Sequence, residues 1–260
     1  MRKLRNAELE QLRFIKEAAA FMPVGEVLYH IHVSKHLGYV FVETPKVACT
    51  TIKRALQVYE YERDGVAVPI FSKHSVHQRN LSPLLRINDS SLPKDVWSDR
   101  NIFKFCVVRN PYERLLSCYL SKIAVPGGPV KKLALSLKFG VSVESVEDVS
   151  QHIAFDDFVE IVGAQRSFDM NPHWRPQSDQ TFQGLVEYNK ICRFERLQDD
   201  LDAVAKALGI PDLLKLENAP NAFGASKQLH DFYNSRTASK VRQIYSRDFE
   251  IFGYPNELPA

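Results

Sequence analysis

The feature that most constrains the fold is the stretch from Tyr39 to Tyr59, which reads as a strand, a short loop and the start of a helix. Its first five residues, YVFVE, are mostly β-branched or aromatic, as in a buried strand. After the polar loop TPKVACTT, apolar residues recur at helical spacing, at Ile52, Ala55, Leu56 and Tyr59. The N–H groups that begin a helix lack internal partners and attract anions. Because Lys46 adds a positive charge and Thr50 and Thr51 add hydroxyl donors, the stretch predicts an anion-binding loop.

A second strand predicts a second anion site further along the chain. Residues 101–108, NIFKFCVV, form a buried-strand pattern that runs directly into Arg109. Asn110 is a good helix N-cap and Pro111 suits the first helical position, so Ser117 lies about two turns into the helix that follows. A planar guanidinium group can hold a phosphate by two hydrogen bonds without a metal ion.

The first loop fits a Walker-type site for nucleoside triphosphates poorly. That motif, GxxxxGK[ST], depends on glycines to curl around the phosphates, and TPKVACTT contains none. A magnesium site also calls for an acidic residue at the end of the second strand, where this chain has Arg109. The pair of loops therefore favours a metal-free dianion.

Further elements complete an α/β pattern with a central, mainly parallel sheet flanked by helices. A third strand is predicted over 190–194, and a strand over 27–33 is expected to pair antiparallel with 39–43. Helices are predicted over 4–21, 154–162, 197–208 and 237–252. The length of 260 residues predicts a single domain over 1–260, with its N-terminal helix within residues 1–25.

The two loops carry a resemblance to a known family. TPKVACTTIKRAL resembles the 5′-phosphosulfate loop of the sulfotransferases, and FCVVRNPYERLLSCY resembles their 3′-phosphate motif. Both are similar to the carbohydrate sulfotransferases of the chondroitin 4-O and HNK-1 type, sulfotransferase family 2, and the likeness continues through VHQRNLSPLL, NPHW, FERLQDDL and DFEIFGY. The resemblance implies a P-loop-like sulfotransferase fold. It also implies transfer of a sulfuryl group from 3′-phosphoadenylyl sulfate (PAPS) to a hydroxyl of a saccharide or glycoconjugate, with PAP as the product.

The resemblance also assigns the donor site. Residues expected at the 5′ end of the donor are Lys46, Val47, Ala48, Cys49, Thr50, Thr51 and Lys53. An alternative is that Lys53 faces solvent on its helix. Arg109 and Ser117 are expected to hold the 3′-phosphate, and Ser226 and Lys227 to close over the nucleotide from the polar loop 217–230. This scheme requires no metal ion.

The acceptor side needs a base, because the attacking hydroxyl must lose its proton. The resemblance places His77 of VHQRN in this role, with His74 as the second candidate for base and for acceptor contact, while Lys46 stabilises charge on the leaving phosphate. His173 and Arg175 are predicted acceptor contacts. Residues 125–150, which open with VPGGP, predict an insertion on the acceptor side.

Histidine and cysteine spacing gives little support to a metal site. His30, His32 and His36 have a spacing that would allow one, but strand and turn histidines are the more ordinary interpretation. The four cysteines show no CxxC spacing, so zinc is not predicted. Cys49, within the anion loop, is predicted to be a small packing residue rather than a reactive thiol.

Composition excludes some partners. The net charge of +3, without a long basic run, gives no indication of nucleic acid binding. No stretch approaches the roughly 20 apolar residues of a membrane span, and the charged N-terminus lacks a signal-peptide pattern. We therefore expect a cytoplasmic, bacterial enzyme, with a trimmed luminal domain as the alternative. The sequence indicates neither the oligomeric state nor the acceptor sugar.

Two functions of other classes stay open at this point. One is a P-loop kinase that uses ATP and Mg²⁺, which the missing glycines and missing strand-end acid disfavour. The other is a non-catalytic nucleotide- or glycan-binding protein on the same scaffold, which the presence of Lys46, Arg109 and a candidate base disfavours.

Overall fold

The computed structural model describes residues 6–34, 36, 38–72, 74–89, 92, 96–210 and 222–259. The chain divides into two compact units, each made of two segments. Unit 1 comprises residues 1–108 and 179–219, and unit 2 comprises residues 109–178 and 220–260. Each unit is described by itself. The single domain over 1–260 stays a prediction.

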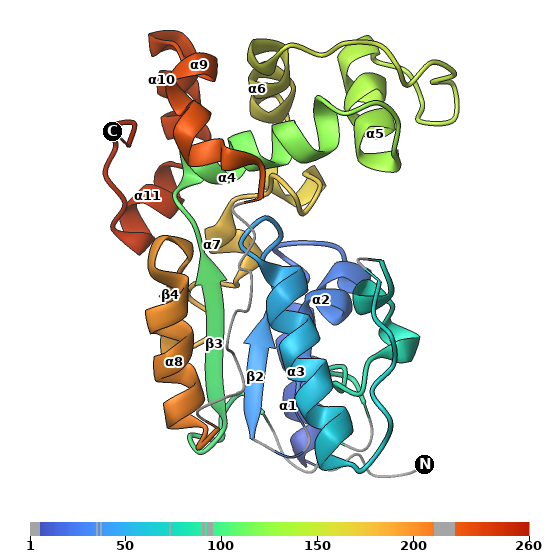
Figure 1. The fold of residues 1–260 in the computed structure, drawn as a ribbon, viewed down its shortest axis with the longest axis vertical. Helices are drawn as coiled ribbons and strands as arrows, with labels where there is room; N and C mark the ends of the chain where they lie inside the picture. The colour runs from blue at the N-terminus through green and yellow to red at the C-terminus, as the bar shows by residue number, and fades with distance from the viewer. Residues whose placement is uncertain are drawn as a thin grey trace. The chain divides into compact units, whose positions relative to one another are not determined.

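Unit 1 is built around a four-stranded sheet in the order β1-β2-β3-β4 (Figure 1). Strands β2 (Tyr39–Val42), β3 (Phe103–Val108) and β4 (Lys190–Arg193) run parallel, and β1 (Ile31–Val33) pairs antiparallel with β2. This arrangement confirms the predicted α/β fold with a mainly parallel central sheet.

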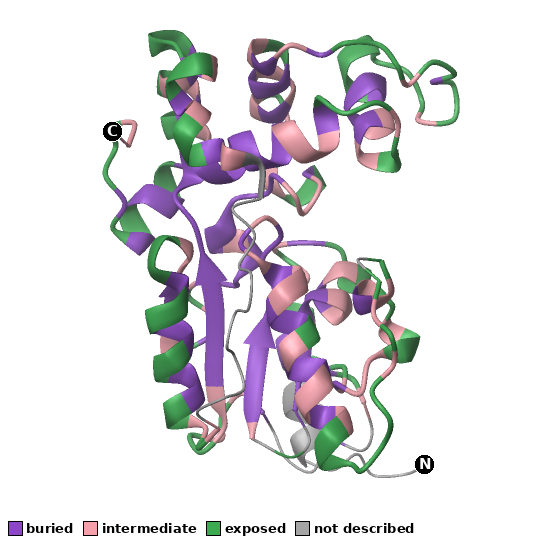
Figure 2. Ribbon diagram, viewed as in Figure 1, coloured by how far each residue is buried: buried purple, intermediate pink, exposed green. Residues whose placement is uncertain are grey.

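The core of unit 1 forms where two helices cover one face of the sheet. Tyr39 and Phe41 alternate with residues of the opposite face, as the period of two in a strand requires, and Phe41 lies opposite Phe105 in the register. These rings pack against α3 (Cys49–Arg63) and α8 (Leu197–Ala207). Figure 2 shows that most of β2 and β3 and the inner sides of both helices are buried.

The N-terminal part differs from the sequence prediction. Instead of one helix over 4–21 and a strand over 27–33, the chain forms α1 (Asn6–Ala18) and then α2 (Val24–His30). Pro23 stands before α2, and only Ile31–Val33 have pairing partners on β2. The His30 carbonyl still accepts from the Glu43 N–H at 2.8 Å, and the residues before it form a helix that buries Val27. The predicted antiparallel pairing with the Tyr39 strand is confirmed.

Short helices complete unit 1. The segment after α3 contains the 3₁₀ turns η1 (Ser75–His77) and η2 (Arg79–Leu81), and η5 (Phe194–Arg196) precedes α8. Helix α7 (Gln177–Gln180) lies at the boundary of the two units in sequence. The turn η1 carries His77, and His74 immediately precedes it. These are the two histidines considered as the base.

Unit 2 is helical within its described residues. Helix α4 (Pro111–Cys118) continues as a π-helical turn, η3 (Tyr119–Ile123), and α6 (Phe155–Gly163) follows later. The predicted insertion 125–150 contains α5 (Pro129–Phe139). The remaining elements are η4 (Ser167–Asp169), η6 (Ala222–Gln228), α9 (Leu229–Phe232), α10 (Ser235–Ile244) and α11 (Ser246–Phe252).

One long predicted helix, over 237–252, is divided in the structure. Helix α10 begins earlier, because Asn234 and Thr237 form a capping box, and it ends at Ile244, where Tyr245 leaves helical geometry. Burial explains the break, since Tyr245 is buried and its hydroxyl donates to the Trp174 carbonyl at 2.7 Å. Of the predicted late loop 217–230, residues 217–221 lie outside the described part of the chain.

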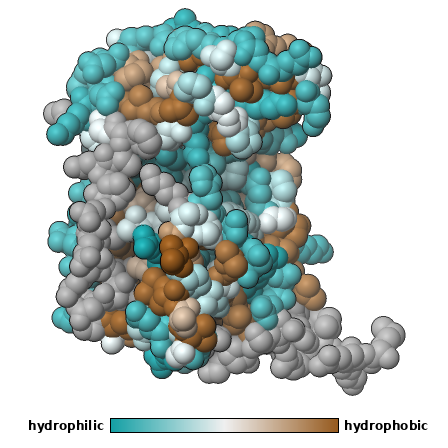
Figure 3. Space-filling view, turned by 45° about the vertical axis from the view of Figure 1, so that its right-hand side comes forward, coloured by the Kyte–Doolittle hydropathy of each residue, from teal (hydrophilic) through white to brown (hydrophobic). Residues whose placement is uncertain are grey.

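The molecular surface mixes hydrophobic and hydrophilic residues over the face shown in Figure 3. Some apolar side chains are well exposed, among them Ile70 and Phe139. Among the helices of the described residues, none has both the length and the apolar character needed to cross a membrane.

Candidate functional site

The anion loop follows β2 directly and has an unusual backbone. Lys46 (φ 74°) and Ala48 (φ 66°) are both left-handed, although neither is glycine. Left-handed and right-handed residues in succession turn backbone N–H groups toward a common point, which is how anion-binding nests form. The chain thus achieves without glycine the curl that a Walker loop obtains from it. Non-glycine residues held in this region concentrate at functional sites.

The loop ends where α3 begins. Ala48 is the N-cap, and its carbonyl accepts the first helical bond, from the Ile52 N–H at 3.1 Å. The N–H groups of the first helical turn therefore face the loop with the positive end of the helix dipole. Cys49 is buried there, and burial, reinforced by the Glu43 charge, raises the pKa of its thiol to about 12. A thiol held in this neutral form agrees with the packing role predicted for it.

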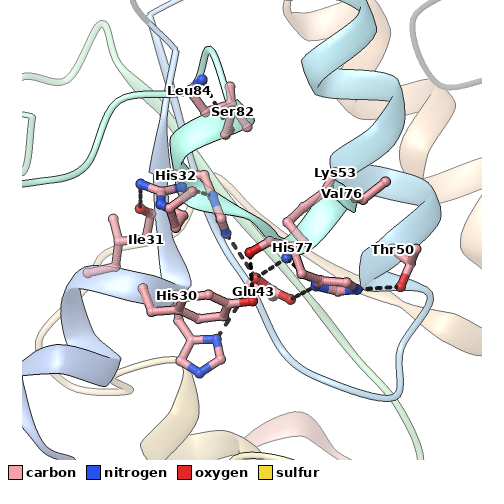
Figure 4. Close-up of polar contacts among 12 residues, drawn as sticks. His30, Ile31, His32, Glu43, Thr50, Lys53, Val76, His77, Ser82 and Leu84 are labelled. Carbon is pink, nitrogen blue, oxygen red and sulfur yellow. Dashed lines mark hydrogen bonds and ion pairs between the residues drawn. The ribbon is translucent and has the colours of Figure 1, made fainter. Parts of the chain in front are cut away.

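His77 lies on η1 and reaches this helix start. Its backbone is tied down from two sides, since Gln57 Nε2 donates to the Val76 carbonyl at 3.0 Å and Tyr29 donates to the His77 carbonyl at 3.3 Å. Its ring nitrogens contact α3: Nε2 lies 3.0 Å from Thr50 Oγ1, and Nδ1 lies 2.7 Å from Lys53 Nζ (Figure 4).

His77 and His74 differ clearly in environment. The His77 side chain is 32% exposed, so it is accessible while held by Thr50 and Lys53. His74 is exposed just before η1, and its backbone N–H donates to the Ser72 hydroxyl at 3.3 Å. Of the two predicted bases, the structure brings His77 to the loop.

Glu43, at the end of β2, is the centre of the cluster, and sequence reasoning treated it only as part of a strand. Its Oε2 lies 2.8 Å from Lys53 Nζ and 2.9 Å from His32 Nε2, while its Oε1 lies 3.9 Å from His77 Nδ1. Burial raises the pKa of this carboxyl, but Lys53 and the His32 hydrogen bond outweigh burial and hold the pKa well below its usual range. The available signal was an acidic residue within an otherwise apolar strand, next to an anion loop.

His32 and Arg79 form the outer part of the same cluster. Arg79 Nη1 contacts His32 Nδ1, and a guanidinium group can only donate. His32 Nδ1 must therefore accept, and its proton lies on Nε2, which donates to Glu43. Burial lowers the pKa of His32 to about 3, although the Glu43 hydrogen bond opposes this shift. His30 Nδ1 lies 3.9 Å from Glu43 Oε2.

Lys53 was expected to bind the donor, with a solvent-facing position as the alternative. Its side chain is 1% exposed, which rules out the solvent-facing alternative, while the donor contact stays a prediction. Its ammonium group binds Glu43 and His77 and lies 5.4 Å from the centre of the Tyr29 ring. The Lys53 ammonium group thus lies between His77 and Glu43, where it supplies the positive charge that a metal ion would bring. Within the described residues, no group of three or more His, Cys, Asp or Glu side chains could hold a metal ion.

Unit 2 contains the second predicted anion site. Buried Arg109 donates from Nε and Nη2 to Glu113 Oε2, at 3.1 and 3.0 Å, and Ser226 donates to the same oxygen at 2.8 Å. The Arg109 backbone is fixed by reciprocal hydrogen bonds with the Gln177 amide, both 2.8 Å long. Two residues predicted for the 3′-phosphate, Arg109 and Ser226, therefore meet at one carboxylate oxygen.

The other predicted residues of this site lie on α4, which follows Arg109, and on η6, which carries Ser226. Ser117 is buried on α4, and Lys227 is exposed beside Ser226 on η6. Helix α4 begins as predicted, with Asn110 accepting from the Tyr112 N–H at 3.0 Å. Glu113, in the first turn of this helix, pairs with Arg109.

The predicted acceptor residues divide into one accessible side chain and one buried side chain. His173 is half-buried, with Nδ1 2.7 Å from Asn171 Oδ1. Arg175 is 1% exposed and donates to the carbonyls of Ser167, Phe168 and Met170. Its guanidinium group holds this loop together, which favours a structural role instead of the predicted acceptor contact. Trp174, between them, is fully buried.

Comparison with known proteins gives one consistent family. The model of the sulfotransferase family matches residues 29–255. Carbohydrate sulfotransferase 11 of Danio rerio is 25% identical over 243 residues, covering 87% of this chain and 67% of that protein. Human carbohydrate sulfotransferases 14 and 10 are 25% and 26% identical, covering 90% and 89% of this chain and 63% and 69% of those proteins.

The chain therefore spans about two thirds of the length of these relatives. No solved structure gives a significant match. The family match covers most of both units, including the anion loop, His77 and the Arg109 segment. This match, together with the α/β fold and the loop geometry, shows that the chain belongs to the sulfotransferase family.

Proposed function

We propose that this chain is a carbohydrate O-sulfotransferase that moves the sulfuryl group of PAPS to a hydroxyl of a saccharide or glycoconjugate. The observation that carries the proposal is the contact of His77 with Thr50, at the helix start that follows the left-handed anion loop. A histidine in this place can accept the proton of a hydroxyl that attacks a group held by the loop. Matches to relatives named carbohydrate sulfotransferases support the saccharide acceptor.

In the proposed reaction, the acceptor oxygen forms a bond to sulfur while the bond from sulfur to the 5′-phosphate oxygen breaks. The acceptor proton passes to His77. Negative charge grows on the leaving phosphate oxygen, where the loop N–H groups and Lys46 stabilise it. Thr50 and Thr51 supply hydroxyl donors at the same helix start. The geometry follows the in-line logic of phosphoryl transfer.

The 3′-phosphate of the donor is assigned to the residues of unit 2. Arg109 and Ser226 both donate to one carboxylate oxygen of Glu113, and in the proposed complex the 3′-phosphate takes over these hydrogen bonds from Glu113. Ser117 and Lys227 belong to the same assignment. A cytoplasmic location and a bacterial source stay predictions.

Donor binding can be tested before any acceptor is known. PAP, AMP and ATP–Mg²⁺ are titrated calorimetrically into the wild type, Arg109→Gln and Arg236→Gln, the last changing an exposed arginine of unit 2 that pairs with Glu160. We expect PAP to bind best, and Arg109→Gln to weaken PAP about 10- to 100-fold, as for loss of hydrogen bonds to a charged group. Arg236→Gln should bind PAP like the wild type. Preference for ATP–Mg²⁺, or equal PAP affinity in Arg109→Gln, would refute the donor assignment.

Catalysis is tested next with PAPS and a panel of saccharide acceptors. His77→Ala should lower the rate of transfer by roughly 10²- to 10⁴-fold, which is the usual contribution of a general base. His74→Ala is the comparison. Loss of transfer only in His74→Ala would move the base to that residue. A wild type that binds PAP but transfers sulfate to no acceptor would support the non-catalytic alternative.

A further inference from the structure

The cluster around Glu43 determines more about His77 than its position. We propose that Lys53 and Glu43 are positioning residues that select which ring nitrogen of His77 carries the proton. In the arrangement observed, Lys53 places that proton on Nε2. When the hydrogen bond at Nδ1 passes from Lys53 to Glu43, the proton moves to Nδ1 and Nε2 becomes able to accept another. The catalytic consequence rests on the proposed function, but the tautomer itself does not.

The direction of the hydrogen bonds follows from the chemistry of Lys53. An ammonium group has three donors and no acceptor, and Lys53 Nζ lies 2.7 Å from His77 Nδ1. Nδ1 must therefore present its lone pair. The proton of the neutral ring is then on Nε2, which donates to Thr50 Oγ1 at 3.0 Å. Glu43 keeps Lys53 in place, through the 2.8 Å contact with Oε2.

This tautomer does not suit a general base. A base needs an available lone pair, and here the Nδ1 pair accepts from Lys53 while Nε2 carries hydrogen. Base competence at Nε2 requires a proton on Nδ1 and an acceptor for that proton. A carboxylate behind a catalytic histidine supplies this acceptor in the serine-protease triad.

Glu43 is placed to be that acceptor. Its two oxygens have different neighbours: Oε2 binds Lys53 and His32, while Oε1 lies on the His77 side, 3.9 Å from Nδ1. A shift of about 1 Å brings this pair to hydrogen-bond distance. Lys53 keeps its contact with Oε2 in this arrangement and gives up only the one with Nδ1.

The exchange is balanced in protons. One proton leaves Nε2, one is gained by Nδ1, and the net charge of the cluster does not change. The His77 side chain is 32% exposed, so water can carry the proton. The other charged or titratable side chains around the cluster are His30 and Tyr29 from α2, His32 from β1, Cys49 from α3 and Arg79 from η2. His32 holds Glu43 directly, and Arg79 holds it through His32.

The tautomer can be measured on the full chain without any substrate. Long-range ¹⁵N–¹H correlation spectra distinguish protonated from unprotonated ring nitrogens, and His77→Asn identifies the His77 signals among the eight histidines. In the wild type near neutral pH, we expect the Nε2-protonated form. In Lys53→Met, which removes the donor at Nδ1, we expect the Nδ1-protonated form bound to Glu43.

Two further variants keep the test decisive. If Lys53→Met does not fold, the double variant Lys53→Met/Glu43→Gln leaves no buried charge unpaired, and we expect it to populate both tautomers. Lys206→Met changes an exposed lysine on α8 and should leave the His77 signals unchanged. An Nδ1-protonated wild type overturns the proposal. The proposal is also overturned if His77 stays protonated on Nε2 in Lys53→Met. That result is expected if the Lys53–Glu43 pair is purely structural.

Activity then separates this inference from the proposed function. With PAPS and an active acceptor, Glu43→Gln should lower kcat about 10- to 100-fold, less than the full contribution of a base, with little change in the KM for PAPS. An unchanged kcat would overturn the positioning role. If the wild type transfers no sulfate at all, the proposed function fails, while the spectra still decide the tautomer.

Discussion

His32 should make the stability of this protein unusually sensitive to mild acid. It is buried, its Nδ1 accepts from Arg79, and its Nε2 donates to Glu43 at 2.9 Å. Burial lowers the pKa of His32 from 6.5 to about 3. Between these two values the unfolded chain binds a proton that the folded chain does not, so the free energy of unfolding must fall as the pH falls.

The size of the effect follows from these two pKa values. Stability from this group is fully present above about pH 6.5 and decreases by up to about 1.4 kcal/mol per pH unit below it. Between pH 7 and pH 5, the expected loss is about 2 kcal/mol. The window lies above the range in which Glu43 titrates, because the pKa of Glu43 is held well below its usual value.

The assay is urea unfolding of the wild type, His32→Gln and His152→Gln at pH 7, 6 and 5. Glutamine can accept from Arg79 and donate to Glu43, but it does not titrate, so His32→Gln should lose about 2 kcal/mol less than the wild type over this range. His152→Gln changes an exposed histidine and is the matched control. Identical pH dependence in the wild type and His32→Gln would refute the assignment of a neutral, buried His32.

Three other changes test single features by urea unfolding. Ala48→Gly relieves a left-handed alanine and should stabilise the fold by about 0.5–1 kcal/mol, the strain removed less the entropy of glycine; a destabilised variant would contradict the loop geometry. Asn110→Ala removes the cap on the Tyr112 N–H and should cost about 1 kcal/mol; no loss would argue against that cap. Lys53→Met should cost about 3–5 kcal/mol by leaving Glu43 buried without its cation, while adding Glu43→Gln should restore most of the loss; equal losses in both variants would refute the pairing.

The sequence predicted the parts of the fold that local patterns determine. The strand at Tyr39, the loop after it and the helix through Tyr59 lie next to one another in the chain, so alternation and helical spacing were sufficient. The same holds for the strand that ends at Arg109 and for the Asn110 cap. The strand predicted over 27–33 was wrong in its bounds, because β-branched content alone does not show how many residues have a pairing partner. Only three of them do.

Pairings between distant residues could not be predicted in the same way. Arg175, in a loop rich in polar residues, looked like a ligand contact, yet its hydrogen bonds go to carbonyls of its own loop. Lys53 was predicted to bind the donor or else to face solvent, because helix periodicity does not show that Glu43 lies next to it at the end of the strand. His77 was found through the family resemblance, and its partners became visible only in three dimensions.

The Glu43–Lys53 pair itself indicates which of its possible roles is the main one. A buried ion pair is weak evidence for stability, since well-packed apolar residues in its place are often as good or better. Methionine at position 53 and a neutral residue at 43 would still join α3 to the end of β2. What they could not do is place a donor on His77 Nδ1, 24 residues along the chain, with a carboxylate oxygen behind it. The double variant should therefore keep most of its folding stability and lose its tautomer preference. If the pair served stability alone, the double variant would instead lose folding stability and keep the tautomer preference of His77.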